Sequence, residues 1–539
     1  MNILGIHGGV TINQHDAGAA LIMEGKLICV VEEERLIRIK TATGTLPTES
    51  IAACLRESGL TMQDIDVVVL AGETYEDIIP RTAEWLKHHF GTSPRIEKIN
   101  HHTAHIASAF YHSGLDSAMC ISVDAYGDGL SGAIAIGSLQ TGITILETIP
   151  ANNSLGIFYS TMTSFLGFRP GEDEYKVMGL APYGNPSIDL SFFCKPVPEG
   201  FFCDPKFFRS RKAATSLEPY YSKLLLDQLG NPRRKGEPIS QMFKDIAAST
   251  QLTLETSLVS LVTKAFEMTN EKALCLAGGV ALNCSANRLL YNLPFISELF
   301  VQPASSDRGL PLGCALFMAF ICGEKIEPIP HVFYGPSQSS KEIESAISLS
   351  GVSATKVANP EIEAAKRIAT GEIVGWFQGR SEFGPRALGH RSILANPTIS
   401  DMKDQINSKV KFREEFRPFA PSVLEEDSYD MFEMKNPSPY MTVAYNVKNP
   451  WNTIMKSTTH VNNTGRVQTV NSATDPHFYN LISEVKSLTG CPAVLNTSFN
   501  IKGQPIVEKP LEAISTFYGT GMDSLLIGNY LLTKNKTKI

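Results

Sequence analysis

Three of the chain's 12 histidines fall within six residues, in the segment NHHTAH at positions 100–105. Asparagine is a favoured residue just before a helix, so the segment predicts a helix that begins after Asn100. On that helix His101 and His105 lie one turn apart on the same face, where two imidazoles can reach one metal ion. His102 lies about 100° further round the helix and is not expected to share the site. The pattern alone fits a structural pair of histidines equally well.

Two carboxylates are candidates to complete such a site. Asp124 ends the apolar run CISVD, and Asp307 precedes a glycine-rich helix start. Active sites of α/β proteins gather at the ends of strands, although either residue could instead cap a helix. A set of two histidines and two aspartates offers nitrogen and oxygen ligands. Such ligands favour Fe(II), Mn or Zn over a cysteine-rich structural zinc.

Two glycine-rich segments are candidate phosphate loops, because glycines let backbone amides approach anionic oxygens. Each glycine pair could also be only a turn, but together they predict a nucleotide cleft. Lys176, in GEDEYKVMGLAPYG, could contact a phosphate or lie on a solvated helix start. The candidate residues of the two loops, DAYGDG (124–129) and AGGVALN (277–283), are Gly127, Asp128, Gly129, Gly278, Gly279 and Asn283.

A histidine beside a carboxylate, His15 with Asp16 in HDAGAA, is a candidate general base for a hydroxyl group. A hydrogen-bonded loop histidine is the competing interpretation.

The last third of the chain concentrates cations among aromatic residues, as in KFREEFRPFAPSV. Arginine and lysine, together with hydroxyl and amide donors, are typical of a site for a phosphate or carboxylate. The candidates are Arg386, His390, Arg391, Lys411, Arg413, Arg417 and Arg466, with Asn496, Ser498 and Asn500 in VLNTSFNIKGQP.

The elements that must position these residues repeat. A strand, a polar loop and a β-hairpin occur near 2–34 and again near 118–150, with helical patterns at 48–59, 77–89 and 240–270 between and after them. A strand, a Gly-Gly turn and a helix start follow near 273–290. This α/β plan predicts a duplicated, actin-like fold. Proline, glycine and serine at 325–345 indicate a boundary between domains 1–335 and 336–539.

The bulk composition narrows the class of protein. A chain of 539 residues exceeds what one core usually supports. Its net charge of -7 disfavours a nucleic-acid groove or a basic membrane-binding surface. Ten cysteines without a CxxC pair, and no signal-peptide pattern, predict a cytoplasmic protein. The apolar segment 312–323 is too short to span a bilayer and predicts a buried helix.

These motifs, with SSDRGLPLGCAL and GRSEFGPRALGHRSILANP, resemble the carbamoyltransferase family that includes NodU and TobZ, over essentially the whole chain. The resemblance implies an N-terminal Kae/TsaD-like actin-fold domain and a C-terminal YrdC-like α/β domain. The latter would convert carbamoyl phosphate and ATP, with Mg, into a carbamoyl-adenylate, releasing phosphate and pyrophosphate. The former would transfer the carbamoyl group to an acceptor hydroxyl while an iron-type metal grips the adenylate phosphate.

The resemblance also implies roles for residues. His101, His105, Asp124 and Asp307 would bind the metal, and His15 would be the base. Lys411, Arg417, Arg466 and Ser498 would hold carbamoyl phosphate or the adenylate, with Arg386 nearby. The chain departs from the family at Asn13, just before HDA, and at Asn462, where aspartate is common.

The function predicted first is therefore an ATP-dependent O-carbamoyltransferase that acts on a small natural product. A fused tRNA threonylcarbamoyl-adenosine-type enzyme is an alternative that the acidic composition disfavours. A non-catalytic actin-like nucleotide-binding protein is another, but it leaves the metal ligands and the C-terminal cations without a role. The oligomeric state is left open, and a homodimer is compatible with the sequence.

Overall fold

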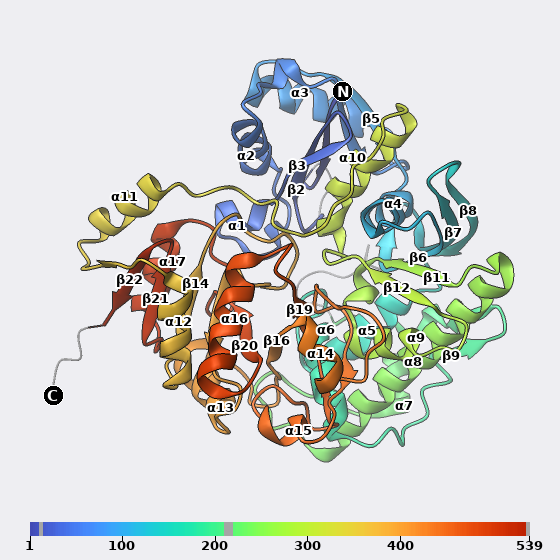
Figure 1. Ribbon diagram of the computed structural model, residues 1–539. Helices are drawn as coiled ribbons and strands as arrows, with labels where there is room; N and C mark the ends of the chain where they lie inside the picture. The colour runs from blue at the N-terminus through green and yellow to red at the C-terminus, as the bar shows by residue number, and fades with distance from the viewer. Residues whose placement is uncertain (10–13, 210–218, 535–539) are drawn as a thin grey trace. The chain divides into compact units, whose positions relative to one another are not determined.

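The computed structural model describes residues 1–9, 14–209 and 219–534 (Figure 1). They form two compact units. The first unit comprises Met1–Val69, Pro80–Ile96 and Glu327–Ile539, and the second comprises Leu70–Ile79 and Glu97–Ile326. The boundary expected near residue 335 lies in an irregular segment between helix α10 (Leu310–Ile321) and helix α11 (Ser340–Ser350). The assignment of 1–335 and 336–539 to separate activities stays a prediction.

Two five-stranded sheets share one strand order, which confirms the predicted duplication. The orders are β3-β2-β1-β4-β5 and β8-β7-β6-β11-β12, so in each sheet a first strand has an antiparallel hairpin on one side and two later strands on the other. The first sheet consists of β1 (Asn2–His7), β2 (Gly18–Met23), β3 (Lys26–Glu32), β4 (Val67–Ala71) and β5 (Arg95–Ile99). The second consists of β6 (Ser117–Gly127), β7 (Leu130–Ser138), β8 (Gly142–Pro150), β11 (Ala273–Ala277) and β12 (Glu298–Val301).

A two-residue turn closes the first hairpin. Met23 pairs with Lys26, and the intervening Glu24 and Gly25 both have positive φ, at 51° and 79°. Such a turn matches the right-handed twist of the strands that it joins. The strands it joins are largely buried, which is typical of a central sheet covered by helices.

Helix α4 (His101–Ser113) packs against α10 in the second unit (Figure 1). A Cβ on Gly313 of α10 would lie 1.8 Å from the carbonyl oxygen of Ala104, so only glycine allows this approach. The long helix predicted at 240–270 is α8 (Gln241–Thr269). The other helices of this unit are α5 (Leu155–Phe165), α6 (Glu174–Leu180), α7 (Lys223–Leu229) and α9 (Cys284–Tyr291), and β9 (Cys194–Val197) pairs with β10 (Gly200–Cys203).

The first unit also holds an eight-stranded mixed sheet in the order β13-β22-β21-β14-β15-β20-β16-β19. Its strands are β13 (Thr355–Lys356), β14 (Val374–Phe377), β15 (Arg391–Ala395), β16 (Ala420–Leu424), β19 (Gln468–Val470), β20 (Ala493–Ser498), β21 (Ser524–Ile527) and β22 (Tyr530–Thr533). Apolar side chains alternate between its faces: Ile393 packs with α11, α13 (Met402–Ile406) and α17 (Pro510–Tyr518), and Leu394 with α12 (Pro360–Ala369) and α16 (Pro476–Thr489). The YrdC-like assignment of this region stays a prediction.

The smaller elements of the first unit are α1 (Glu33–Ile37), α2 (Thr48–Ser58), α3 (Ile78–Phe90), α14 (Glu425–Met431), α15 (Trp451–Ile454), β17 (Tyr445–Asn446) and β18 (Thr464–Gly465). The helices predicted at 48–59 and 77–89 are α2 and α3. Within the described part of the chain, no helix combines the length and the apolar character needed to cross a membrane.

Candidate functional site

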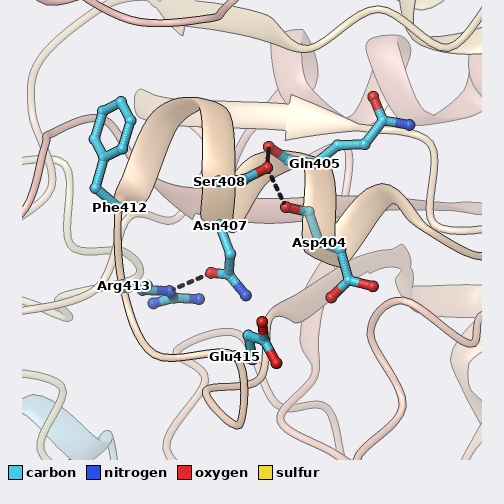
Figure 2. A pocket seen from close by; sticks show the side chains of 7 residues that line it. All are labelled: Asp404, Gln405, Asn407, Ser408, Phe412, Arg413 and Glu415. Carbon is cyan, nitrogen blue, oxygen red and sulfur yellow. Dashed lines mark hydrogen bonds between the residues drawn. The ribbon is translucent and has the colours of Figure 1, made fainter.

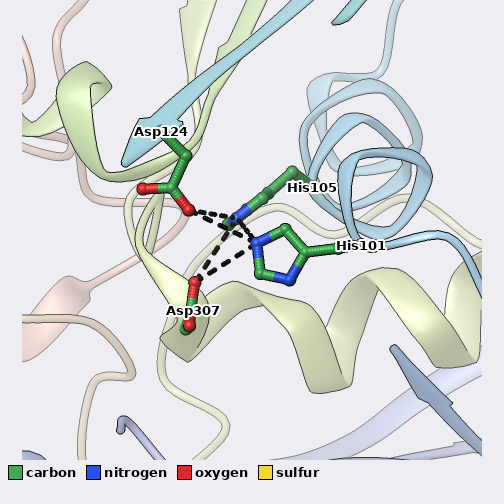
Figure 3. Close-up of side chains that lie close together, drawn as sticks. All are labelled: His101, His105, Asp124 and Asp307. Atoms are coloured by element: carbon green, nitrogen blue, oxygen red, sulfur yellow. Dashed lines mark hydrogen bonds and ion pairs between the residues drawn. The ribbon is translucent and has the colours of Figure 1, made fainter. Parts of the chain in front are cut away.

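The second unit brings His101, His105, Asp124 and Asp307 together, as Figure 3 shows. The two Nε2 atoms of the histidines lie 3.1 Å apart. Asp124 Oδ2 lies 3.3 Å from Nε2 of His101 and 3.4 Å from Nε2 of His105. Asp307 Oδ1 lies 3.6 and 3.5 Å from the same two atoms. His105 is fully buried and the other three side chains are 9–13% exposed, so the group is largely shielded from solvent.

Two polar side chains set the start of α4 and thereby place both histidines. Asn100 is the N-cap, as predicted, and its side chain accepts hydrogen bonds from the amides of His102 and Thr103. Asp128 accepts a 2.8 Å hydrogen bond from the His101 amide, and further bonds from the amides of Glu73 and Thr74. Because these carboxylate oxygens satisfy donors that a helix end leaves open, the first turn of α4 is anchored to the turn after β6.

Glycines allow the backbone to pass close to the metal candidates. A Cβ on Gly127 would lie 2.2 Å from the ring of His101, and a Cβ on Gly278 would lie 2.2 Å from the carbonyl oxygen of Val123. The Gly279 amide donates a 3.2 Å hydrogen bond to Asp124 Oδ1. These glycines therefore help to shape the group of His101, His105, Asp124 and Asp307. Their predicted role in binding phosphate stays a prediction.

The charges of the two carboxylates favour a positive charge within this group. Burial alone would lower the pKa of His105, but hydrogen bonds and charges from Asp124 and Asp307 raise it to about 9. Burial would raise the pKa of Asp124, yet hydrogen bonds from His101 and His105 hold it well below its usual range. Two carboxylates this close to each other therefore require a positive charge between them, either a proton on an imidazole or a metal ion.

The donor set fits a metal ion. Ligand atoms about 2.0–2.2 Å from a tetrahedral ion are separated by roughly 3.3–3.6 Å, and the measured separations between nitrogen and oxygen atoms fall in that range. His102 stands apart, as predicted: its Nδ1 lies 2.9 Å from Ser122 Oγ. Burial and the neighbouring His101 and His105 lower the pKa of His102 to about 3, so it stays neutral. These four residues are thus a group that could hold a metal ion.

Other predicted residues of this unit make internal contacts. Lys176 Nζ lies 3.0 Å from Asp173 Oδ2 and packs over the Phe168 ring. Asn283 caps α9 through the Ala286 amide and exchanges hydrogen bonds with Gln251. Gly129 has a positive φ of 80° in the turn between β6 and β7. A role of these residues toward a nucleotide stays a prediction.

His15 and Asp16 lie in the first unit. Nδ1 of His15 is 3.4 Å from Oδ2 of Asp16, and the histidine side chain is 32% exposed while the carboxylate is 7% exposed. Asp16 has a positive φ of 59°, and its amide donates to the carbonyl of Thr41. Asn13, the departure noted before this pair, lies outside the described residues.

Three of the predicted C-terminal residues meet in the first unit. Lys411 Nζ donates to the carbonyl oxygen and Oγ of Ser498, and to the carbonyl oxygen and Oδ1 of Asn500. Within the described chain, no carboxylate lies at ion-pair distance from this ammonium group. Burial, together with the positive charges of Arg413 and Arg417, holds the pKa of Lys411 well below its usual range. A buried cation among cations and neutral oxygens is suited to an anionic ligand.

The whole sequence matches a family in two parts. The description "Carbamoyltransferase N-terminus" matches residues 3–90 and 75–316, and "Carbamoyltransferase C-terminus" matches residues 365–534. The chain belongs to the carbamoyltransferase family. The chain is therefore an enzyme of this family, which excludes the alternative of a non-catalytic actin-like nucleotide-binding protein.

Relatives extend over most of the chain. The nodulation protein NolNO of Sinorhizobium fredii is 37% identical over 96% of this chain and 79% of its own length. The nodulation protein NolO of Bradyrhizobium diazoefficiens is 38% identical over 82% of this chain and 80% of its own. Among solved structures, T. kodakarensis HypF is similar at 15% identity, with a TM-score of 0.38, over 60% of this chain and 48% of that one.

Most other predicted C-terminal residues of this carbamoyltransferase contact neighbouring side chains or backbone carbonyls. Arg417 Nη1 is 3.7 Å from Glu414 Oε2, and Arg386 is half-buried. Asn496 Nδ2 donates to the carbonyl of Ala387 and to Ser422 Oγ. Arg391 is fully buried and donates to backbone carbonyls, while His390 Nε2 is 3.3 Å from Asp475 Oδ2.

Asn407 was not predicted as a site residue from the sequence. Asn407, 3% exposed, accepts from Arg413 Nε at 2.7 Å, and both line a pocket of about 410 Å³ (Figure 2). His460 was overlooked as well. Burial, with the charges of Arg466 and Lys403, lowers its pKa to about 3. Arg466 is one of the predicted phosphate ligands. The position of His460 six residues before the predicted phosphate ligand Arg466, in HVNNTGR, could have indicated it as a site residue.

Proposed function

We propose that this carbamoyltransferase uses carbamoyl phosphate and ATP to make a carbamoyl-adenylate, and transfers the carbamoyl group to a hydroxyl of a small-molecule acceptor. The observation that carries the proposal is the group of two imidazoles and two carboxylates within 4.8 Å in a chain of this family. The buried Lys411, without a carboxylate partner among the described residues, supports it, because it offers a site for an anion.

His101, His105, Asp124 and Asp307 would hold the metal ion, with Fe(II), Mn and Zn all compatible with the donors. When bound, the metal would supply positive charge for the phosphate of the adenylate as AMP leaves. Asn100 and Asp128 hold the two histidines in place through the first turn of α4. The enclosed position of the group limits the access of water to the activated carbamoyl group.

The C-terminal cations perform the activating step. Lys411, Arg417 and Arg466, with Arg386 nearby, would bind the phosphate groups, while Ser498, Asn496 and Asn500 offer neutral donors and acceptors. Water first cleaves carbamoyl phosphate to carbamate and inorganic phosphate. A carbamate oxygen then bonds to the α-phosphorus of ATP, the bond from that phosphorus to the bridging oxygen of the β-phosphate breaks, and pyrophosphate leaves. The oxygens of Ser498 and Asn500 hold the Lys411 ammonium group in position.

His15 is suited to accept the proton of the acceptor hydroxyl. The Asp16 carboxylate next to Nδ1 favours a proton on that nitrogen, which leaves Nε2 in its acceptor form. The acceptor oxygen then bonds to the carbamoyl carbon, the bond from that carbon to the adenylate oxygen breaks, and AMP leaves with both electrons. The proton moves from the hydroxyl to His15 Nε2.

The test uses the metal-loaded, full-length protein. Pyrophosphate is expected only when ATP and carbamoyl phosphate are both present. Candidate hydroxyl acceptors incubated with ¹³C-labelled carbamoyl phosphate should gain the labelled carbamoyl mass. Absence of pyrophosphate from metal-replete protein, at every carbamoyl phosphate concentration tried, contradicts the proposal.

A further inference from the structure

His460 is held in one tautomer by a short chain of hydrogen bonds. Its Nδ1 lies 3.0 Å from Thr464 Oγ1, and that hydroxyl donates at 2.8 Å to Asn462 Oδ1. A hydroxyl has one proton to donate, and Thr464 uses it for Asn462. Thr464 Oγ1 must therefore accept from Nδ1, so Nδ1 carries the hydrogen and Nε2 carries the lone pair.

The turn around His460 makes this arrangement rigid. The His460 amide donates at 2.8 Å to the carbonyl of Thr464, and the Asn463 amide donates at 2.9 Å to the carbonyl of His460. Two backbone and two side-chain hydrogen bonds thus link residues within the five-residue segment 460–464. No described residue makes a hydrogen bond to Nε2, and His460 is only partly buried, so this lone pair is open to a ligand.

The surroundings of His460 are cationic. Burial is the main cause that lowers the pKa of His460 to about 3, and the positive charges of Arg466 and Lys403 add to this effect. The imidazole is therefore neutral throughout the physiological range, and Nε2 keeps its acceptor character. A neutral acceptor among cations selects an unusual ligand: an anion that also carries a hydrogen-bond donor.

Carbamoyl phosphate has both features in one small molecule, since its phosphate is anionic and its amide nitrogen carries two hydrogens. We propose that Nε2 of His460 accepts a hydrogen bond from the carbamoyl NH₂ and makes the site specific for carbamoyl phosphate over acyl phosphates. Acetyl phosphate presents a methyl group at that position and leaves the lone pair unpaired. The adenine amine of ATP is remote from its phosphates and does not account for the cations around Nε2. The inference rests on the proposed function and deepens it.

Two substitutions of His460 distinguish the roles of its two ring nitrogens, and a third tests the residue that fixes the tautomer. His460→Asn keeps a donor near the position of Nδ1 for Thr464 and removes the acceptor at Nε2. His460→Gln places an amide oxygen near the position of Nε2 and keeps the acceptor. Thr464→Val removes the hydroxyl that selects the tautomer while preserving side-chain shape, so Thr464 is a positioning residue.

The primary measurement is calorimetric binding of carbamoyl phosphate and of acetyl phosphate to the full-length protein. The second measurement is the KM for carbamoyl phosphate and the KM for ATP. For His460→Asn we expect carbamoyl phosphate to bind about tenfold more weakly while the Kd of acetyl phosphate is unchanged. His460→Gln should stay within about threefold of the wild type, and Thr464→Val should fall between them. KM for ATP should not change in any variant. Thermal unfolding establishes that each variant is folded.

Equal weakening of both phosphates, or weakening of neither, overturns the inference. A rise confined to the KM of ATP overturns it as well and assigns Nε2 to the adenine amine. If the wild type releases no pyrophosphate, the proposed function fails, whereas the two binding constants still decide the role of His460. If pyrophosphate is released and His460→Asn leaves selectivity intact, this inference alone fails.

Discussion

Nε2 of His101 and Nε2 of His105 lie 3.1 Å apart inside the protein, with carboxylate oxygens of Asp124 and Asp307 within 3.6 Å of both. Two imidazole lone pairs at this distance repel unless a proton or a metal ion lies between them. The carboxylates add two negative charges, which makes a divalent cation the better match. The group is therefore suited to hold a cation, as the proposed reaction at a phosphate group requires.

Replacement of either metal candidate should abolish stoichiometric metal binding. For His101→Ala and His105→Ala we expect roughly a hundredfold loss of affinity, because each removes one of four ligands. Metal content by elemental analysis after dialysis measures the effect. His102→Asn is the matched control on the same helix, since its amide can keep the contact with Ser122 Oγ, and it should retain the metal. Equal metal content in all three variants contradicts the assignment.

Gly127→Ala should weaken metal binding without unfolding the protein. The added Cβ would lie 2.2 Å from the His101 ring, so the imidazole must turn away from Asp124 and Asp307. Metal titration monitored by calorimetry should show at least about tenfold weaker binding. Gly519→Ala serves as control, because its Cβ would come no closer than 3.1 Å to its neighbours and lies far along the sequence. Unchanged affinity would mean that the ring adjusts without leaving the group.

Lys411→Met should remove phosphate binding while leaving the fold intact. Carbamoyl phosphate at ten times its Kd stabilises the wild type by about 1.4 kcal/mol, and the variant should lose this stabilisation. The measurement is the shift in Tm on adding the ligand, with pyrophosphate release as a second readout. Lys409→Met is the control, since Lys409 lies in the same helical turn but is exposed. A ligand-induced shift that persists in Lys411→Met would place the anion elsewhere.

The ion pair of His390 with Asp475 should stabilise the first unit only at lower pH. Burial would lower the pKa of His390, but the charge and hydrogen bond of Asp475 raise it above its ordinary value. Because the folded-state pKa is raised, this stabilisation is complete below about pH 6.5 and is lost as pH rises through the folded pKa. Asp475→Asn should therefore lower Tm more at pH 5.5 than at pH 9.

Two features keep that comparison interpretable. Asparagine at 475 can still accept from the Phe478 amide, so the cap of α16 is preserved. Asp427→Asn removes the exposed pair with Lys486, whose effect should not change across this pH range. A pH-independent difference for Asp475→Asn would show that only packing or capping has changed.

The sequence by itself determined the repeated strand and hairpin pattern, the helix after Asn100 and the pairing of His101 with His105. These are local properties: the 2.0 and 3.6 residue periods and the cap depend on neighbours in the chain. The sequence also singled out Lys411, Ser498 and Asn500, which the structure brings into hydrogen-bond contact.

Only the tertiary structure decided which distant groups meet. Asp307 reaches His101 across more than 200 residues because Gly313 allows α10 to lie against Ala104 of α4. The anchoring of α4 by Asp128, and the tautomer of His460 imposed by Thr464, depend on atomic distances that spacing does not encode. The sequence determines which chemical groups the side chains carry, whereas packing determines the direction in which each lone pair points.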